Sequence, residues 1–368
     1  MALNNMLEAL HDEYDITLAI FNSNGPLKEQ VPENVHLIKL SPLVEVLGMS
    51  QKDCKLYGSF TQRLFKLIGG AWSKVFGNSL PVNFALLSQK NVGEYDAVIS
   101  YHQETSSKTL VTGFGKFALK KCKSPRKVAW VHADFLATDL GTKRNFKTYN
   151  EFDKIIHVSQ TCMKNFITVY PDLENKCGYC YNYIPAKRIF EKAIAQENVY
   201  SRGPETLILF SACRLSEEKG LIPALENLLP VWENEHTVKW YIAGDGLLRE
   251  RLEKMIQEKN LSDRVILLGY QSNPYPYIRE ADFLFLPSLH ETFSMVVGEA
   301  HVLGTSVIAS DIPIMREVLD EGDSLCANGD FYTCIHEKLR GDLRVRQHEC
   351  DYDAIKQTWL KWFEGIVK

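Results

Sequence analysis

The sequence predicts an α/β protein built from doubly wound parallel sheets. Short apolar runs alternate with longer helical patterns along the whole chain, as at Thr206–Ala212 and Asp282–Leu286. Most of these runs are continuously apolar, which is typical of strands buried on both faces of a parallel sheet. Right-handed crossovers would then place helices on both faces of each sheet.

Ten segments have the length and composition of such strands. The first half contributes Tyr14–Phe21, Val35–Leu40, Asp96–Tyr101, Lys127–Val131 and Asp153–Val158. The second half contributes Thr206–Ala212, Val238–Ala243, Val265–Gly269, Asp282–Leu286 and Ser306–Ala309.

The chain of 368 residues is long for one hydrophobic core, so two domains are expected. The break between them is marked by Asn182–Pro185, a polar helical stretch and the turn signal Ser201–Pro204. A doubly wound domain normally opens with a strand and a glycine-rich turn. Here Ala2–His11 is already helical in pattern and leads directly into Tyr14–Phe21. We therefore expect that the opening strand is missing by truncation, the alternative being a domain that starts with a helix.

Composition limits the partners and the compartment. Hydrophobic residues make up 45% and charged residues 24%, and the net charge of −4 does not suggest nucleic acid as the main partner. No apolar stretch approaches the roughly 18 residues of a transmembrane helix, and the first residues do not resemble a signal peptide. The nine scattered cysteines favour a reducing, cytoplasmic setting.

The pair Cys177 and Cys180 is interpreted as structural rather than as a redox pair or half of a zinc site.

A polar loop and a helix start follow the predicted strand that ends at Pro287. Glu291 lies in this loop, at the edge where open α/β sheets bind ligands. The helix begins near Ser294, and Glu299 lies near its second turn. The free N–H groups of such a helix start can bind a diphosphate, and the two carboxylates can bind sugar and ribose hydroxyls. Alone, either glutamate would be interpreted as an ordinary helix or surface acid.

Two cations bracket the turn after the first predicted strand of the second half. Arg214 and Lys219 follow Thr206–Ala212, again at a carboxyl edge. Cations placed there can neutralise a nucleotide diphosphate, both bound and as a leaving group. Either one alone is more typical of a solvated charge near a turn.

Together these segments resemble a known family. Arg214 with Lys219-Gly220, then Ala243–Gly246, then Glu291 and Glu299 are similar in order and spacing to the retaining group 1 glycosyltransferases of glycogen-synthase, polysaccharide and glycolipid synthesis. That family has the GT-B fold, in which two doubly wound domains face each other across a cleft. The resemblance implies an acceptor-side domain over 1–185, a donor-binding domain over 186–349, and a terminal helix over 350–368 that crosses back to the first domain.

The resemblance also implies roles for single residues. Arg214 and Lys219 would hold the donor diphosphate, Glu291 would contact the donor sugar, and Glu299 would contact the ribose. Further donor-binding positions are Gly244, Gly269, Tyr270, Thr292, Phe293, Ser294, Met295 and Val296. The base would lie near Gly269 and Tyr270, and the backbone from Thr292 to Val296 would cradle phosphate and sugar. His132, in Val128–Asp134, would contact the transferred sugar.

The chain also departs from the family pattern. The opening strand and Gly-Gly loop are missing, which leaves activity of the chain as given in question. Thr292 stands where glycine is common and would narrow the sugar pocket. No metal or other cofactor is expected, because the one Asp-x-Asp triplet, Asp351–Asp353, lies far from any predicted strand end.

Two basic segments allow a membrane contact. Apolar residues recur at helical spacing in 60–76 together with Arg63, Lys66 and Lys74, and a second basic run covers 116–127. A basic amphipathic helix can lie on the anionic inner face of a membrane. Two alternatives stay open: the helix packs its apolar stripe on the first domain, and the second run is a solvated face.

The resemblance implies transfer of a sugar, with retention of configuration, from a nucleotide sugar to a cell-surface glycan or glycolipid. A UDP-sugar is the expected donor, with GDP-sugars as the alternative. Two other functions stay open: a nucleotide-sugar-binding protein without turnover, and a sugar-nucleotide epimerase of similar fold.

Overall fold

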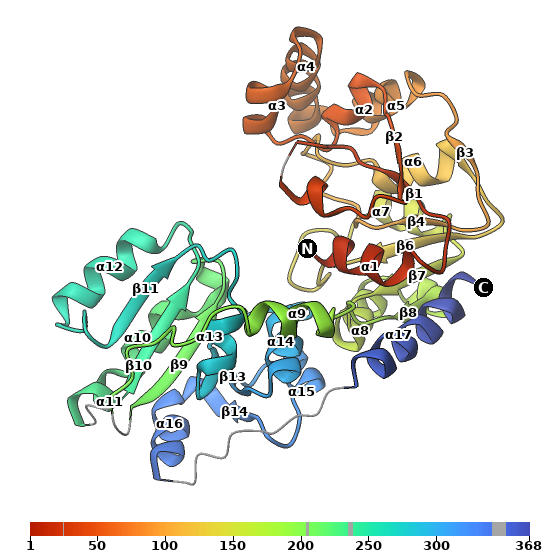
Figure 1. Cartoon of the computed structure of the whole chain (residues 1–368). Coiled ribbons are helices and arrows are strands. Elements are labelled where there is room, and N and C mark those ends of the chain that lie inside the picture. Colours follow the sequence, from red (N-terminus) through yellow and green to blue (C-terminus); the bar gives the residue numbers. More distant parts are fainter. Residues whose placement is uncertain (25, 204–205, 235–237, 341–350) are drawn as a thin grey trace. The chain divides into compact units, whose positions relative to one another are not determined.

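The computed structural model describes residues 1–24, 26–203, 206–234, 238–340 and 351–368. The chain divides into two compact units, Met1–Tyr183 with Lys356–Lys368, and Ile184–Ile355. Pro204 and the predicted boundary at 349–350 lie outside the described residues. Each unit combines helices with parallel sheets, so the predicted α/β class is confirmed (Figure 1).

The second unit is built on one six-stranded parallel sheet with the order β11-β10-β9-β12-β13-β14. Its strands are β9 (Leu207–Ala212), β10 (Val238–Ala243), β11 (Val265–Gly269), β12 (Phe283–Leu286), β13 (Ser306–Ser310) and β14 (Ser324–Cys326). Numbered from β9, this order is 3-2-1-4-5-6, the order of a dinucleotide-binding doubly wound sheet. The direction of winding reverses between β9 and β12.

Helices cover both faces of this sheet because both faces are apolar. Leu209 and Trp240 belong to one core cluster, whereas their neighbours Phe210 and Tyr241 belong to another on the opposite face. The helices are α9 (Ala186–Ala193), α10 (Leu221–Asn227), α11 (Leu229–Asn234), α12 (Arg249–Glu258), α13 (Tyr275–Glu280), α14 (Met295–Leu303), α15 (Pro313–Val318) and α16 (Phe331–Arg340).

The first unit contains three parallel sheets in place of one continuous sheet. A four-stranded sheet has the order β4-β6-β7-β8, whereas β1 pairs with β2 and β3 pairs with β5. The strands are β1 (Thr17–Ala19), β2 (His36–Ile38), β3 (Gly93–Glu94), β4 (Val98–Ser100), β5 (Cys122–Lys123), β6 (Lys127–Val131), β7 (Lys154–His157) and β8 (Cys177–Tyr179). Two predicted strands, Tyr14–Phe21 and Val35–Leu40, thus form a separate ribbon, because their short paired segments hydrogen-bond only to each other among the described strands.

The helices of the first unit pack around its sheets and extend beyond them (Figure 1). They are α1 (Ala2–Leu10), α2 (Pro42–Val46), α3 (Gln51–Tyr57), α4 (Phe60–Phe76), α5 (Ser79–Leu87), α6 (Phe114–Lys121), α7 (Lys143–Asn150), α8 (Gln160–Val169) and α17 (Tyr352–Val367). Figure 1 shows α3 and α4 at the opposite end of this unit from α17. Trp359 of α17 donates to the carbonyl of Tyr181 at 2.8 Å, and Trp362 packs edge-on against Tyr179. The terminal helix is therefore anchored on the sheet of the first unit.

Helix α4 buries its polar side and exposes its apolar side. Its buried stripe consists of polar and small residues, Gln62, Lys66, Gly69 and Ser73. Its large apolar residues are exposed, for example Leu67 at 69% and Val75 at 73%. The alternative in which α4 packs its apolar stripe on the first domain is therefore wrong, because polar contacts to α2 occupy the inward face. None of the described helices is both long enough and apolar enough to cross a membrane.

Candidate functional site

The candidate site lies where the winding of the second sheet reverses. Strands β9 and β12 are neighbours, although 70 residues separate their ends in sequence. The loop after β9 carries Arg214 and Lys219, and the loop after β12 carries Glu291. Open α/β sheets bind ligands at this edge, because the loops on either side of the reversal diverge and leave a crevice.

An ion pair joins these two loops. Lys219 Nζ lies 2.6 Å from Glu291 Oε1, and the hydroxyl of Ser288 donates to the same oxygen at 3.0 Å. The backbone N–H of Leu289 donates to the carbonyl of Glu218 at 2.9 Å. The predicted cation and the predicted carboxylate are thus in direct contact. Ser288 is a member of this group that sequence reasoning missed.

Glycine makes the close approach of the two loops possible. Gly220 has a positive φ of 62°, and a Cβ at this position would lie 2.0 Å from the carbonyl oxygen of Pro287. Any side chain would therefore push apart the loops that carry Lys219 and Glu291. In the Lys219-Gly220 dipeptide, Lys219 supplies the positive charge, and Gly220 leaves room for the loop that carries Glu291 to approach.

The loop after β10 is packed equally tightly against the loop after β9. A Cβ on Gly244 would lie 1.8 Å from the carbonyl oxygen of Cys213. The N–H of Leu215 donates to the carbonyl of Asp245 at 3.0 Å, and the N–H of Gly244 donates to that of Gly269 at 2.8 Å. These contacts bring Gly244 and Gly269 to the same sheet edge as exposed Arg214.

Tyr270 follows Gly269 directly. Its side chain is 79% exposed. An exposed aromatic ring at this edge can stack on a planar base.

The start of α14 is strained and carries an unused polar group. Ser294 adopts φ 50° and ψ 75°, a left-handed conformation that is uncommon for a residue other than glycine. Its side chain is buried, and in the described part of the chain its hydroxyl has no hydrogen-bond partner. In the first turn of α14 the N–H of Val297 donates to the carbonyl of Ser294 at 3.1 Å, whereas the N–H groups of Met295 and Val296 have no acceptor within the helix. Together they can receive the oxygens of an anion.

Glu299, on α14, interacts with residues of α13 and α9. It is 6% exposed, and Tyr275 of α13 donates a hydrogen bond to its carboxylate at 3.4 Å. Burial raises the pKa of Glu299 to about 7, opposed by the hydrogen bond from Tyr275 and by the charge of Arg188 on α9. Tyr275 and Arg188 could not be found from the sequence, because only the packing of α9 and α13 on α14 brings them to Glu299.

His132 belongs to the first unit, whereas the other candidate residues belong to the second. It follows β6, and its ring contacts that of Tyr101 with centroids 4.6 Å apart. Burial lowers the pKa of His132 to about 4, with a smaller effect from His102, so the imidazole is neutral near pH 7. Its Nε2 is buried without a partner among the described residues. It is therefore a candidate to bind a sugar hydroxyl.

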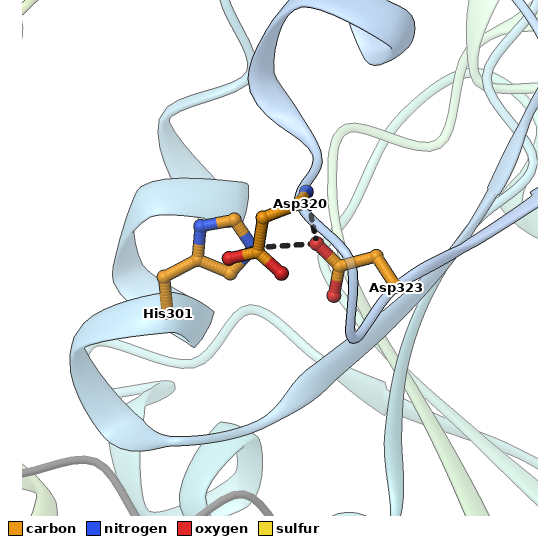
Figure 2. A group of neighbouring side chains, drawn as sticks. All are labelled: His301, Asp320 and Asp323. Atoms are coloured by element: carbon orange, nitrogen blue, oxygen red, sulfur yellow. Dashed lines mark hydrogen bonds and ion pairs between the residues drawn. The ribbon is translucent and has the colours of Figure 1, made fainter.

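Figure 2 shows a cluster of His301, Asp320 and Asp323, which has the residue types of a cation site. Asp323 accepts from the N–H of Val307 at 2.8 Å, and its other oxygen lies 2.7 Å from His301 Nε2. That oxygen also accepts from the N–H of Asp320 at 3.1 Å. These bonds connect α14, β13 and the turn before β14, so the cluster acts as a structural brace. The cluster was not among the predicted site residues.

Cys177 and Cys180 lie at β8. Burial raises the pKa of each thiol to about 12, so both stay protonated near pH 7. This supports the structural interpretation, because thiolates are the redox-active and metal-binding form.

Comparison with known proteins agrees with this geometry. Residues 194–336 match the sequence profile of the family Glycosyl transferases group 1. The chain is 27% identical over 171 residues to the O-antigen biosynthesis glycosyltransferase WclY of Escherichia coli, and the match covers 46% of each protein. It is 37% identical over 132 residues to the lipopolysaccharide core biosynthesis glycosyltransferase LpsD of Rhizobium meliloti, covering 35% of this chain and 36% of LpsD. The chain thus spans less than half the length of these curated relatives.

Solved structures resemble the chain over nearly its whole length. Anabaena HepE in complex with UDP and glucose has a TM-score of 0.61 at 18% identity, covering 99% of this chain and 95% of HepE. The galactosyltransferase WaaB of the lipopolysaccharide outer core has a TM-score of 0.56 at 17% identity, covering 100% of this chain and 92% of WaaB. The fold is that of the GT-B glycosyltransferases. The match to the glycosyl transferases group 1 family lies within the second unit.

Proposed function

We propose that the protein is a retaining glycosyltransferase that transfers a sugar from a UDP-sugar to a glycan or a lipid-linked acceptor. The observation that carries this proposal is the ion pair between Lys219 and Glu291 at the reversal point of the second sheet. The cation can bind a diphosphate and the carboxylate can bind sugar hydroxyls. The two groups are in direct hydrogen-bond contact.

The donor is bound by groups of opposite character. Exposed Arg214, together with Lys219 and the start of α14, provides positive potential for the diphosphate. A bound diphosphate competes with Glu291 for Lys219, which frees Glu291 to accept hydrogen bonds from the sugar. As the glycosidic bond of the donor breaks, the same cations stabilise the charge on the departing UDP.

Other groups position the two ends of the donor. Tyr270 offers a stacking surface for the base, and Glu299 is assigned to the ribose. Neutral His132 is assigned to the transferred sugar. Thr292 limits the space beside that sugar, because glycine is common at this position in the family that the chain resembles.

Relatives and structural neighbours support the choice of substrates. HepE was solved with UDP and glucose, and a relative from Campylobacter jejuni, 28% identical over 166 residues, is named as a transferase acting on a diphospho-undecaprenol. A nucleotide-sugar donor and a glycan or lipid-linked acceptor follow by analogy. We place the protein in the cytoplasm, because the described cysteines are free thiols.

A product assay tests the proposal. Purified protein is incubated with a panel of UDP- and GDP-sugars and glycan or polyprenyl-diphosphate acceptors, and products are identified by mass spectrometry and NMR. A glycosylated acceptor that keeps the anomeric configuration of the donor supports the proposal. Binding of UDP without any product would instead indicate a nucleotide-sugar-binding protein, and an isomerised sugar nucleotide would indicate an epimerase.

A further inference from the structure

The most unusual surface of the first unit is the exposed face of α3, α4 and α5. Large apolar side chains that a soluble domain would normally bury point to solvent on all three helices. These are Leu56 and Tyr57 of α3, Phe60, Leu64, Leu67, Ile68, Trp72, Val75 and Phe76 of α4, and Leu80, Phe84 and Leu87 of α5. We call this set the apolar face. Contiguous apolar patches of this kind mark interaction sites.

The orientation of α4 is held by specific polar bonds. Gln62 donates to the carbonyl of Pro42 at 3.0 Å and to the carboxylate of Glu45 at 3.1 Å. The buried ammonium of Lys66 donates to the carbonyls of Val46 and Met49, at 3.2 and 2.5 Å. A buried lysine with these partners fixes which side of the helix faces inward. The apolar face is therefore directed outward by the fold.

The neighbouring helices extend the same surface. Both Leu80 and Leu87 lie on one side of α5, separated by two turns, and both are largely exposed. The rings of Phe65 on α4 and Phe84 on α5 contact each other, with centroids 6.1 Å apart. Trp72 and Phe76 pack together at 4.7 Å. The exposed residues thus form one surface that runs across α4 and α5.

The charge around this surface is strongly biased. Residues 51–90 contain six lysines and arginines and a single aspartate, a net charge of about +5 in a chain whose net charge is −4. All of these cations except Lys66 are exposed. Arg63 and Lys74 are eleven residues apart, or three helical turns, so they lie along the same edge of the apolar stripe of α4. A second copy of this face would bring like charges together, whereas an anionic surface would complement them.

We propose that the apolar face of α3–α5 docks the protein onto an anionic lipid surface. The apolar side chains of α4 and α5 enter the boundary between headgroups and acyl chains, and Trp72 lies at headgroup level, where aromatic rings are favoured. Arg63 and Lys74 of α4, with Lys52 and Lys55 of the neighbouring α3, bind the lipid phosphates. This surface is independent of the sugar-transfer proposal, because none of its residues belongs to the nucleotide site.

The second basic run, 116–127, is not part of this surface. Two of its cations are bound within the unit, since Lys127 donates to the carbonyl of Leu119 and Arg126 donates to that of Val367. Within the described residues, no large apolar side chain of 116–127 is among the exposed ones. We therefore interpret the run as a solvated face.

Vesicle flotation without any nucleotide tests the proposal. The full chain is mixed with vesicles of phosphatidylcholine alone or of phosphatidylcholine with phosphatidylglycerol. We expect binding to the anionic vesicles. The double substitution Leu67→Gln with Ile68→Gln should weaken it at least about tenfold, because two large side chains lose their apolar contact with lipid. The matched control is Ile194→Gln with Leu325→Gln, which removes two exposed apolar residues of the second unit and should change little.

The charges are tested in the same way. Arg63→Ser with Lys74→Ser should weaken binding to anionic vesicles about fivefold for each charge. Lys120→Ser with Lys123→Ser removes two exposed cations of the second basic run and should have little effect. Glutamine and serine replace exposed residues, so circular dichroism and thermal melting should confirm that all variants are folded.

Four results would overturn the proposal. The wild-type chain could fail to float, or both pairs of variants and controls could lose binding equally. Equal binding to neutral and anionic vesicles would exclude the anionic surface. A dimer in solution that Leu67→Gln with Ile68→Gln converts to a monomer, with no vesicle binding, would show that the face joins two copies of the chain.

Discussion

The ammonium of Lys219 and the carboxylate of Glu291 form an ion pair at 2.6 Å that connects the loop after β9 with the loop after β12. Both side chains are largely but not completely buried, with 20% and 13% of their surfaces exposed. A ligand that enters between these loops must therefore exchange this pair for contacts of its own. We expect a nucleotide sugar to make this exchange, because its diphosphate can replace the carboxylate and its hydroxyls can replace the ammonium.

The first prediction concerns the two cations. Arg214→Ala and Lys219→Ala should each weaken UDP binding about ten- to hundredfold, because a charged hydrogen bond contributes about 1.5–3 kcal/mol. Glu291→Gln should leave UDP affinity unchanged or raise it, because Lys219 is released from its partner, while turnover falls. Isothermal titration calorimetry measures the UDP affinity of all three variants, and the product assay measures the turnover of Glu291→Gln. Equal losses in Lys219→Ala and Glu291→Gln would contradict the division between diphosphate and sugar.

The second prediction concerns Glu299 and pH. Burial raises its pKa from 4.5 to about 7, so the folded state keeps a proton that the unfolded state releases above about pH 4.5. The free energy of unfolding should therefore fall as pH rises from about 4.5 to 7, by about 1–3 kcal/mol from this group, and stay level above pH 7. The buried His132 and His157 have lowered pKa values, so they make the free energy of unfolding rise over part of the same range. The contribution of Glu299 is therefore the difference between the wild type and Glu299→Gln in denaturant unfolding across pH 5–8.

Nucleotide binding should respond to the same ionisation. If Glu299 accepts hydrogen bonds from the ribose, its carboxylate form binds better, and UDP affinity should rise between pH 6 and 8. UDP itself also titrates in this range. The comparison is therefore with Glu299→Gln, whose affinity should be weaker and less dependent on pH. Parallel pH profiles in the two proteins would remove Glu299 from the nucleotide site.

The third prediction isolates the close contact between the two site loops. Gly220→Ala places a Cβ 2.0 Å from the carbonyl oxygen of Pro287, whereas Gly329→Ala places one where no atom lies within 4 Å. Both glycines have positive φ, 62° and 70°, so the backbone strain of about 1–2 kcal/mol is common to both. Gly220→Ala should destabilise the protein by at least about 1 kcal/mol more than Gly329→Ala.

The same pair of variants should differ in UDP binding, because only Gly220→Ala moves Lys219 relative to Glu291. Thermal unfolding and calorimetry provide the two measurements. Identical behaviour of the two variants would mean that the loops can separate without cost.

The fourth prediction concerns metal. The positive groups of the site are Arg214, Lys219 and the start of α14, so transfer should continue in excess EDTA. The double substitution Asp320→Asn with Asp323→Asn should lower stability through the lost brace around His301, without creating a dependence on added cation. Loss of activity on chelation that manganese restores would refute the metal-free proposal.

Sequence reasoning placed side chains correctly where their position depends on the end of a single strand. Arg214, Lys219 and Glu291 each follow an apolar run, and strand ends in a parallel sheet meet at one edge. It could not place Glu299, because its burial depends on the packing of α13 and α9 against α14. It also missed Ser288, whose hydroxyl is one of many in polar loops and gains meaning only from the position of Glu291.

By itself the sequence determined the alternation of strands and helices, the amphipathic character of α4 and the chemistry available at each strand end. These properties are local, since they depend on residue spacing within one element. Only the tertiary structure decided that β9 lies beside β12, which brings Lys219 to Glu291 across 72 residues of chain. It also decided which side of α4 faces inward. An amphipathic pattern defines two faces of a helix, but the carbonyls of Val46 and Met49 that bind Lys66 come from another segment and select the buried one.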